Sequence, residues 1–394
     1  MGTDIDISLR HRETAPVNHK PDQQRYAACR RMWQGCPTIA RTAGGRLFAG
    51  WYSGGSAEPS LYNYNLLICS DDDGMSWSQI LLTVDSLPEK SLQALDIELW
   101  LDPAGKLWLF WVQRDHKQLP VTSPGHLNTW AIVCNDPDAP TLRWSEPRFI
   151  APGFLRCQPT VLSDRRWVLC AYNWSCQCYQ YQESCDEGKS FHMCCGGKKV
   201  PTAFDESMIW ERRSGELVMF ARPDKNIGFT ARSISTDGGK SWSDGELTGI
   251  PNPASRFYIR RLRSGRLLYL GNIHDRQRIN MTAMLSEDDG ATFPYRLLLD
   301  PRDTSYPDAV EGDDGTLYLI WDRGRCYFNE IVFARLSEND ILAGEIKARN
   351  SVCGHIISKN LTPPPGCTAA EMDLWRTADS DLRSLLKNSA ASAL

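Results

Sequence analysis

The sequence repeats one short pattern six times, and repeats of this length predict copies of one structural unit packed against each other. Each copy is a turn of small or acidic residues followed by a stretch in which apolar residues alternate with others. Such alternation, bounded by Gly and Asp, predicts a β-strand. The copies begin at Gly44, Ala104, Asp164, Ser214, Ser264 and Asp314. They recur every 50 to 60 residues or so, which is room for about four strands in each unit.

A second pattern, S-x-D-x-G-x-[S/T]-[W/F], follows four of these strands. The aspartate can accept backbone N–H groups of a tight turn, the glycine allows a left-handed backbone, and the aromatic ring packs the turn against its sheet. We interpret these segments as hairpin turns and not as catalytic sites. Near Asn135 and Ser337 the pattern has decayed. The four copies are SDDDGMSW (70–77), SCDEGKSF (184–191), STDGGKSW (235–242) and SEDDGATF (286–293).

Together the two patterns resemble the Asp-box, or BNR, repeat of the sialidase superfamily, over about residues 25–345. This resemblance implies an all-β fold, a six-bladed β-propeller with four strands in each blade. We assign residues 1–353 to the propeller, and Ile5–Leu9 could add an outer strand to its last blade. Residues 354–394 form a tail in which Thr368 and Glu371 make a capping box, which predicts a short helix.

Charge and hydropathy exclude several classes of partner. The chain has 44 Lys and Arg against 48 Asp and Glu, and no basic stripe that would suit nucleic acid. No segment approaches the ~18 consecutive apolar residues of a membrane helix. Residues 1–12 lack the apolar run of a secretory signal. We therefore expect a cytoplasmic protein that binds neither nucleic acid nor membranes, and we leave its oligomeric state open.

Five of the fourteen cysteines lie within twenty residues, together with His192. Their spacing does not match the C-x2-C pairs typical of zinc sites. Disulfides are rare in a reducing compartment. We expect reduced thiols, no metal and no cofactor, while a metal site or disulfides remain alternatives. The five are Cys176, Cys178, Cys185, Cys194 and Cys195.

In a propeller the innermost strands surround a central channel, where a ligand site can be built. Carboxylates, arginines and a tyrosine stand just before several repeated strands. Such groups suit glycoside hydrolysis, in which one group protonates the leaving oxygen and another attacks or stabilises the anomeric carbon. Propellers that only bind glycans or proteins also have polar channels, so both an enzyme and a binding module fit. The segments are 34–37, 96–98, 158–159, 205–206, 256–261 and 305–308.

Four residues extend the resemblance to the site of the sialidases. Tyr306, in SYPDAVEGDDGTLYL, resembles the nucleophilic tyrosine, and Glu206 resembles the glutamate that activates it. Arg222 and Arg278 resemble the second and third arginines that bind the substrate carboxylate. The resemblance implies an exo-glycoside hydrolase that removes a terminal, acidic sugar from a glycan. A neutral tyrosine would avoid the charge repulsion that a carboxylate nucleophile meets at such a sugar.

Two positions depart from the family pattern. The R-I-P motif of the first blade reads Gly35-Cys36-Pro37, so the first arginine is absent, and Arg30 and Arg31 are the nearby candidates to replace it. The acid/base aspartate expected about 25 residues later is also absent, and Glu58 is the carboxylate nearby. These departures argue against strict sialidase activity.

Asp205 and Asp308 complete the candidate site as substrate-binding carboxylates. Two alternatives to a sialidase-like hydrolase follow from the departures. One is a glycosidase or lyase that acts on a different sugar with the same scaffold. The other is a non-catalytic propeller that binds glycans or proteins.

Overall fold

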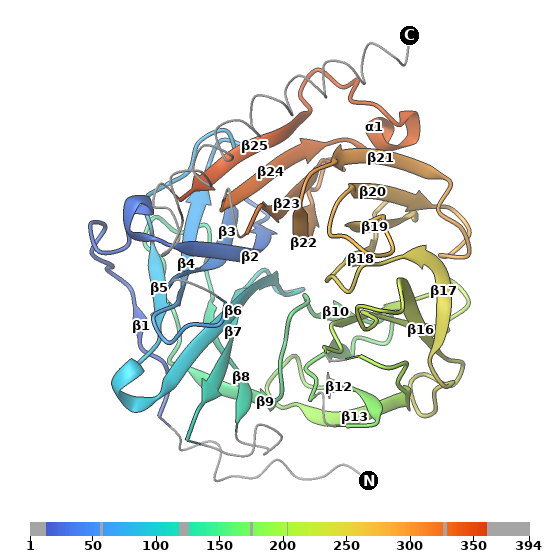
Figure 1. Ribbon diagram of the computed structural model, residues 1–394, viewed down its shortest axis with the longest axis horizontal. Coiled ribbons are helices and arrows are strands. Elements are labelled where there is room, and N and C mark those ends of the chain that lie inside the picture. The colour runs from blue at the N-terminus through green and yellow to red at the C-terminus, as the bar shows by residue number, and fades with distance from the viewer. Residues whose placement is uncertain are drawn as a thin grey trace.

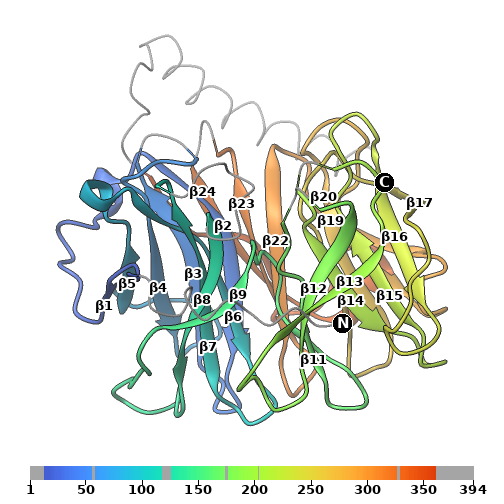
Figure 2. The same cartoon turned by 90° about the horizontal axis from the view of Figure 1, so that it is seen from below.

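The computed structural model describes residues 13–55, 58–117, 126–173, 176–202, 204–325 and 329–360. These residues form six antiparallel sheets, which follow one another in chain order around a central axis (Figure 1). Seen from the side, most strands run roughly along this axis (Figure 2). The fold is the predicted all-β, six-bladed β-propeller. The expected strand Ile5–Leu9 and the expected helix after Thr368 lie outside the described residues.

In every blade the four main strands are consecutive in the chain, and the first strands of most neighbouring blades contact each other around the axis. The strands of blades one to three are β2 (Trp33–Arg41), β3 (Leu47–Gly54), β4 (Tyr64–Ser70), β5 (Leu82–Asp85); β6 (Leu92–Leu101), β7 (Leu107–Asp115), β8 (Leu127–Cys134), β9 (Arg148–Pro152); β10 (Thr160–Val161), β11 (Trp167–Leu169), β12 (Cys178–Ser184) and β13 (His192–Lys198). Those of blades four to six are β14 (Ser207–Glu211), β15 (Leu217–Ala221), β16 (Phe229–Ser235), β17 (Glu246–Pro251); β18 (Tyr258–Arg261), β19 (Leu267–Asn272), β20 (Met281–Ser286), β21 (Tyr295–Asp300); β22 (Thr304–Glu311), β23 (Leu317–Arg323), β24 (Glu330–Leu336) and β25 (Val352–Lys359).

The first and last blades differ from the four-stranded pattern in their outer strands. A short strand, β1 (Val17–Asn18), pairs with β5 and gives blade one a fifth strand. The outer strand of blade six, β25, follows the helix α1 (Glu338–Ala343) and pairs with β24 as far as Lys359. The last blade therefore continues past residue 353, where we placed the end of the propeller from the repeats. Two short 3-10 turns, at Ala28–Arg30 and Pro88–Lys90, connect strands.

The first sequence repeat forms a strand in every blade, as its alternation predicts. This strand is the second of its blade. Five copies enter this strand through a glycine with positive φ, such as Gly105 at 79°. In blade three Arg165 occupies that position with φ of 73°. The tight turn is therefore kept even where the chain lacks the residue that adopts it at least cost.

The second repeat forms the predicted hairpin turns between the third and fourth strands. In the first copy, Asp72 Oδ1 accepts a hydrogen bond from the Ser76 amide at 2.8 Å, and Asp72 Oδ2 accepts one from the Ser76 hydroxyl at 2.6 Å. These bonds lower the pKa of Asp72 to about 2. Gly74 has φ of 82°, and a Cβ there would lie 2.3 Å from Phe333 of blade six. The glycine thus serves both the turn and the contact between blades.

In blade six the helix α1 replaces the decayed turn near Ser337. Ser337 caps α1, and its hydroxyl accepts a hydrogen bond from the Asp340 amide while the Asp340 side chain bonds back to the Ser337 amide. Asp340 also accepts bonds from Lys347, Ala348 and Ser351, which orders the return to β25. A single buried carboxylate therefore organises this connection.

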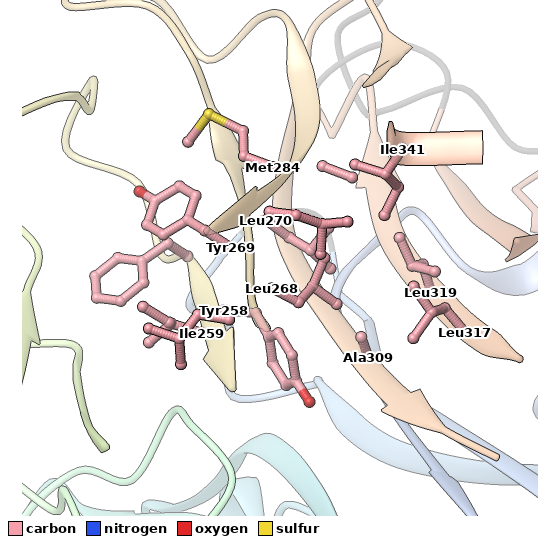
Figure 3. Close-up of a cluster of buried hydrophobic side chains, with 14 of the residues drawn as sticks. Tyr258, Ile259, Leu268, Tyr269, Leu270, Met284, Ala309, Leu317, Leu319 and Ile341 are labelled. Carbon is pink, nitrogen blue, oxygen red and sulfur yellow. The ribbon is translucent and has the colours of Figure 1, made fainter. Parts of the chain in front are cut away.

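A large apolar cluster joins blades four, five and six (Figure 3). It contains Leu268 and Leu270 of β19, Ala309 of β22, Leu319 of β23 and Ile341 of α1. The leucines come from alternating positions of the repeated strands, so one face of these strands packs against the neighbouring blade. Among the described residues, no helix has the length and apolar character needed to span a bilayer.

Replacing Leu268 by Ala is expected to lower the free energy of unfolding by about 3 kcal/mol, because the deletion leaves a cavity in a packed core. Leu268 is 1% exposed. Leu298→Ala on β21 is the matched control: this leucine is 53% exposed, and the change should stay within about 0.5 kcal/mol. Urea unfolding followed by tryptophan fluorescence measures both. Equal shifts in the two variants would contradict the role of the cluster.

Candidate active site

Three β-bulges shape one end of the central axis. The pairing of the inner strands shifts between Gly35 and Thr38 in β2, between Leu95 and Glu98 in β6, and between Ser305 and Asp308 in β22. Each bulge holds a residue with positive φ: Cys36 at 53°, Asp96 at 37° and Tyr306 at 51°. Such a conformation costs a residue with a side chain about 1–3 kcal/mol, and it is concentrated at functional sites. The bulges redirect these side chains relative to the regular strand.

A cavity of about 360 Å³ lies at this end, and its polar lining is dominated by arginine. Five arginines line it against two carboxylates, Glu58 and Asp96, and Tyr306 lies on the same wall. Apolar groups, among them Phe154 and Phe204, complete the lining. The excess of guanidinium groups makes the cavity suited to an anion. The arginines are Arg114, Arg156, Arg222, Arg278 and Arg325.

Tyr306, Glu206 and Arg222 form a closed hydrogen-bonded set. The Tyr306 hydroxyl donates to Glu206 Oε1 at 2.8 Å. Arg222 Nη1 donates to Glu206 Oε2 at 2.8 Å and to the Tyr306 oxygen at 3.0 Å. All three side chains are buried. The structure thus brings together three of the residues that the sequence suggested, from blades four and six.

The charges around this set fix its protonation. Burial alone would raise the pKa of Glu206, but Arg222 and Arg156 outweigh it and lower the pKa to about 2. Burial and the Glu206 carboxylate raise the pKa of Tyr306 to about 12, although the nearby arginines act in the opposite direction. Near neutral pH, Glu206 is therefore a carboxylate that can accept the proton of a neutral tyrosine.

Further arginines surround the ring of Tyr306. The guanidinium carbon of Arg278 lies 5.5 Å from the ring centroid, and Arg278 Nη2 donates to the carbonyl of Ala254 at 2.8 Å. The guanidinium carbons of Arg156 and Arg325 lie 5.1 and 4.1 Å from the same centroid. Arg278 is thus placed in the cavity as the sequence suggested, whereas Arg156 and Arg325 line it without having been identified from the sequence.

Arg325 occupies the space beside Gly35. A Cβ on Gly35 would lie 3.1 Å from Arg325 Nε, so any side chain at this position would meet the guanidinium. Arg325 is held by Asp322, whose Oδ2 accepts bonds from Nε at 2.9 Å and from Nη2 at 2.8 Å. Arg31, considered above as a replacement, bonds instead to Tyr26 and Ser358. The cation next to Gly35 therefore comes from blade six.

Glu58 and Asp96 are the two carboxylates that line the cavity, and their surroundings differ. Glu58 accepts hydrogen bonds from Arg325 at 2.8 Å and Arg156 at 3.4 Å. Burial opposes its ionisation, yet these arginines lower its pKa. Asp96 lies 3.0 Å from Arg156 Nη2, but neither of its oxygens accepts a well-aligned hydrogen bond within the described residues. Burial raises the pKa of Asp96 to about 6, with Arg156 opposing it.

Asp205 and Asp308 do not line the cavity. Asp205 is buried and pairs with Lys199 at 2.7 Å. Asp308 closes the bulge in β22, where its Oδ2 accepts bonds from Thr38 at 2.7 Å and Gln158 at 3.0 Å. Both aspartates therefore make contacts that hold neighbouring segments of the propeller together.

The donor atoms of Cys36, Glu58 and Asp96 lie within 4.8 Å of one another, which is close enough to consider a metal. Arg325 and Arg156, however, donate to the Cys36 sulfur at 3.0 and 3.2 Å and pair with the carboxylates. Two guanidinium groups at this distance would repel a cation. These residues do not fit a metal ion.

Some of the site residues that were not identified from the sequence lie in or near segments that the sequence pattern had singled out. Asp96 stands in one of the polar segments before the repeated strands, and Arg156 lies two residues before another. Arg325 follows the sixth repeated strand, and its side chain lies beside Gly35 of blade one. No spacing rule predicts this contact, because it depends on how the last blade meets the first.

Comparison with known proteins agrees with this architecture. Residues 95–319, more than half of the chain, match the BNR repeat-like domain. The chain belongs to the BNR repeat-like family. Within the wider sialidase/BNR superfamily, this member is 26% identical to a sialidase of Micromonospora viridifaciens over 149 residues. That match covers 35% of this chain and 23% of the relative, so it spans about a quarter of the relative's length.

Solved structures show the same fold for this BNR repeat-like protein. The Hadza microbial sialidase Hz136 superposes with a TM-score of 0.63 at 20% identity, over 79% of this chain and 67% of the other. The NanB sialidase from Streptococcus pneumoniae gives 0.63 at 14% identity, over 79% and 70%. A leech intramolecular trans-sialidase, solved with 2,7-anhydro-Neu5Ac, gives 0.63 at 13% identity, over 84% and 71%. At these identities the likeness establishes the propeller fold.

Proposed function

We propose that this protein is a retaining exo-glycoside hydrolase that removes a terminal acidic sugar from a glycan. The observation that carries the proposal is the Tyr306–Glu206 hydrogen bond of 2.8 Å beside an arginine-lined cavity. A neutral hydroxyl paired with a carboxylate is an arrangement that can produce an activated nucleophile. The sialidase relatives and the leech enzyme's bound sugar support the substrate class.

In the first step, the Tyr306 oxygen attacks the anomeric carbon while its proton passes to Glu206 Oε1. The bond to the leaving glycan breaks, and a proton donor in the cavity supplies the proton that the leaving oxygen takes up. In the second step, water attacks the same carbon and gives its proton to the carboxylate that served as donor in the first step. The bond between the carbon and Tyr306 breaks, and the proton on Glu206 returns to the tyrosine oxygen. Two displacements at one carbon retain its configuration.

The arginines give the reason for an acidic sugar. Arg222, Arg278 and Arg325 all line the cavity that holds Tyr306. Guanidinium groups form paired, charge-assisted hydrogen bonds with a carboxylate, and these are stronger than neutral ones. Arg222 and Arg325 already pair with carboxylates, so a negative sugar would offset the positive charge that remains in the cavity, which a neutral sugar cannot do.

Asp96 is the better suited of the two cavity carboxylates to donate a proton. Glu58 is held as an anion by hydrogen bonds from Arg325 and Arg156. Asp96 accepts no such aligned bond in the described part of the chain, and its pKa of about 6, raised by burial, leaves part of it protonated near neutrality. In this proposal Glu58 positions the two arginines, and Asp96 protonates the leaving oxygen.

The proposed proton donor predicts a pH profile. Because Asp96 must be protonated, kcat/KM should be high below its pKa and fall as the pH rises through about 6. Asp96→Asn should remove this alkaline limb for substrates with a poor leaving group. Substrates with a highly activated leaving group, such as a nitrophenol, need less help and should lose less activity. If the limb survives in Asp96→Asn and disappears in Glu58→Gln, Glu58 is the donor.

The experiment that tests the function is sugar release from a mixed panel of sialylated, uronic-acid-capped and neutral oligosaccharides. We expect release of one acidic monosaccharide, and proton NMR at early times should show the same anomeric configuration as the substrate. Release of an unsaturated sugar would indicate a lyase. Binding to a panel member without any release would contradict the hydrolase proposal and leave a glycan-binding propeller.

A further inference from the structure

A second cluster of reactive side chains lies in blade three, on the β12–β13 hairpin. It consists of Glu183, His192 and Cys194, and the ligand atoms of these three residues all lie within 4.8 Å of one another. Figure 1 places β13 at the outer rim of the ring. None of the three residues lines the Tyr306 cavity. The cluster is therefore independent of the proposed glycosidase site.

The strand register explains how the three residues meet. Glu183 is opposite His192 across the hairpin, and Cys194 is opposite Tyr181. Residues two apart on a strand point to the same face, so His192 and Cys194 project together beside Glu183. Cys195, one residue further, is opposite Gln180 and projects to the other face.

The distances match those of a small tetrahedral metal site. His192 Nε2 lies 3.4 Å from Glu183 Oε1. Two ligands bonded to Zn²⁺ at about 2.1 Å with a tetrahedral angle would be about 3.4 Å apart. The Cys185 sulfur lies 3.7 Å from the same Glu183 oxygen but not within 4.8 Å of all three ligand atoms, so Cys185 is not one of the ligands.

The surroundings hold the carboxylate in place and balance the charge. Arg166 Nη1 contacts Glu183 Oε2 at 2.6 Å, which leaves Oε1 directed toward His192. Arg166 is itself fixed by Asp164 Oδ2 at 2.7 Å and by the carbonyl of Gly238 at 2.9 Å. A divalent cation and Arg166 would together offset the Cys194 thiolate and the carboxylates of Glu183 and Asp164. Outer contacts of this kind orient the ligands of metal sites.

We propose that Glu183, His192 and Cys194 bind a Zn²⁺ ion, with a water molecule in the fourth position. The mixture of sulfur, nitrogen and oxygen donors selects a borderline-soft cation over Mg²⁺ or Ca²⁺. Three protein ligands leave the fourth position of a tetrahedral site to water. The ion would clamp the two strands of the hairpin at the end that carries the Asp-box turn. Binding displaces the proton of the Cys194 thiol to solvent.

The test is a titration of the full chain, stripped of metal with a chelator and kept reduced, with Co²⁺ and then with Zn²⁺. We expect one Co²⁺ per chain with the visible absorption of tetrahedral, thiolate-bound cobalt, and displacement by Zn²⁺. His192→Gln and Cys194→Ser should weaken Zn²⁺ binding by roughly 100-fold or more, since each removes a direct ligand. Zn²⁺ should raise the thermal midpoint of the wild type and not that of these variants.

Cys195→Ser is the matched control, because it removes a thiol from the adjacent position on the opposite face. It should leave the cobalt spectrum and the Zn²⁺ affinity unchanged. His192 has a side chain that is 50% exposed, so its substitution leaves the core intact. Absence of thiolate-bound cobalt in the wild type, or unchanged affinity in His192→Gln and Cys194→Ser, would overturn the proposal. Loss of binding in Cys195→Ser alone would move the site to the other face and equally refute it.

Discussion

Replacing Tyr306 by Phe should lower kcat/KM for the acidic glycan by about 10³-fold or more, which corresponds to ~4 kcal/mol of transition-state stabilisation. The reason is that the variant keeps the ring and the cavity but loses the oxygen that attacks the anomeric carbon. Because the arginines remain, substrate affinity should change little. Initial-rate kinetics and calorimetric binding to an uncleaved analogue measure the two effects separately.

Tyr172→Phe provides the matched control for this experiment. Tyr172 is buried close to the site and stacks on Phe154, yet its hydroxyl has no hydrogen-bond partner in the described parts of the chain. Removing that hydroxyl should leave the kinetics unchanged. If Tyr306→Phe retained full activity, the tyrosine nucleophile would be ruled out. An equal loss in both variants would instead indicate a general disturbance of packing.

The repeats allowed much of the propeller to be predicted, because alternating residues record which face of a blade is buried. The turn patterns also located the hairpins, even in blade three, where Arg165 adopts the left-handed conformation in place of glycine. The connection after Ser337 could not be predicted from the repeat. There the capping box of α1 and the bonds to Asp340 replace the turn, and these interactions share no pattern with the other blades.

The candidate site was predictable only in part. Glu206, Arg222 and Tyr306 were found by their resemblance to a family motif, and the structure places them within hydrogen-bond distance of each other. The sequence could not show the bulge that gives Asp96 its positive φ, because a bulge depends on the pairing of two strands. Nor could it rank Glu58 against Asp96 as proton donor, since their pKa values depend on which arginines lie nearby.

The exchange of Gly35 and Arg325 is the second test with a large expected effect. Arg325→Gly should raise KM for the acidic sugar by about 10- to 100-fold, since a charge-assisted hydrogen bond contributes roughly 1.5–3 kcal/mol. Gly35→Arg alone should also impair the site, because its Cβ would lie 3.1 Å from Arg325 Nε. The double variant removes that conflict and restores a guanidinium from blade one.

We therefore expect Gly35→Arg/Arg325→Gly to bind the acidic sugar more tightly than either single variant, which a double-mutant cycle on KM would reveal as coupling. The glycine at position 35 and the arginine at 325 would then be a matched pair. Gly35 leaves space in blade one, and Arg325 of blade six fills that space with its guanidinium group. Arg325→Lys should recover only part of the affinity, because an ammonium group cannot make the paired, planar contacts of a guanidinium. Strictly additive effects of the two changes would show that Arg325 supports Asp322 and Glu58 without contacting the substrate.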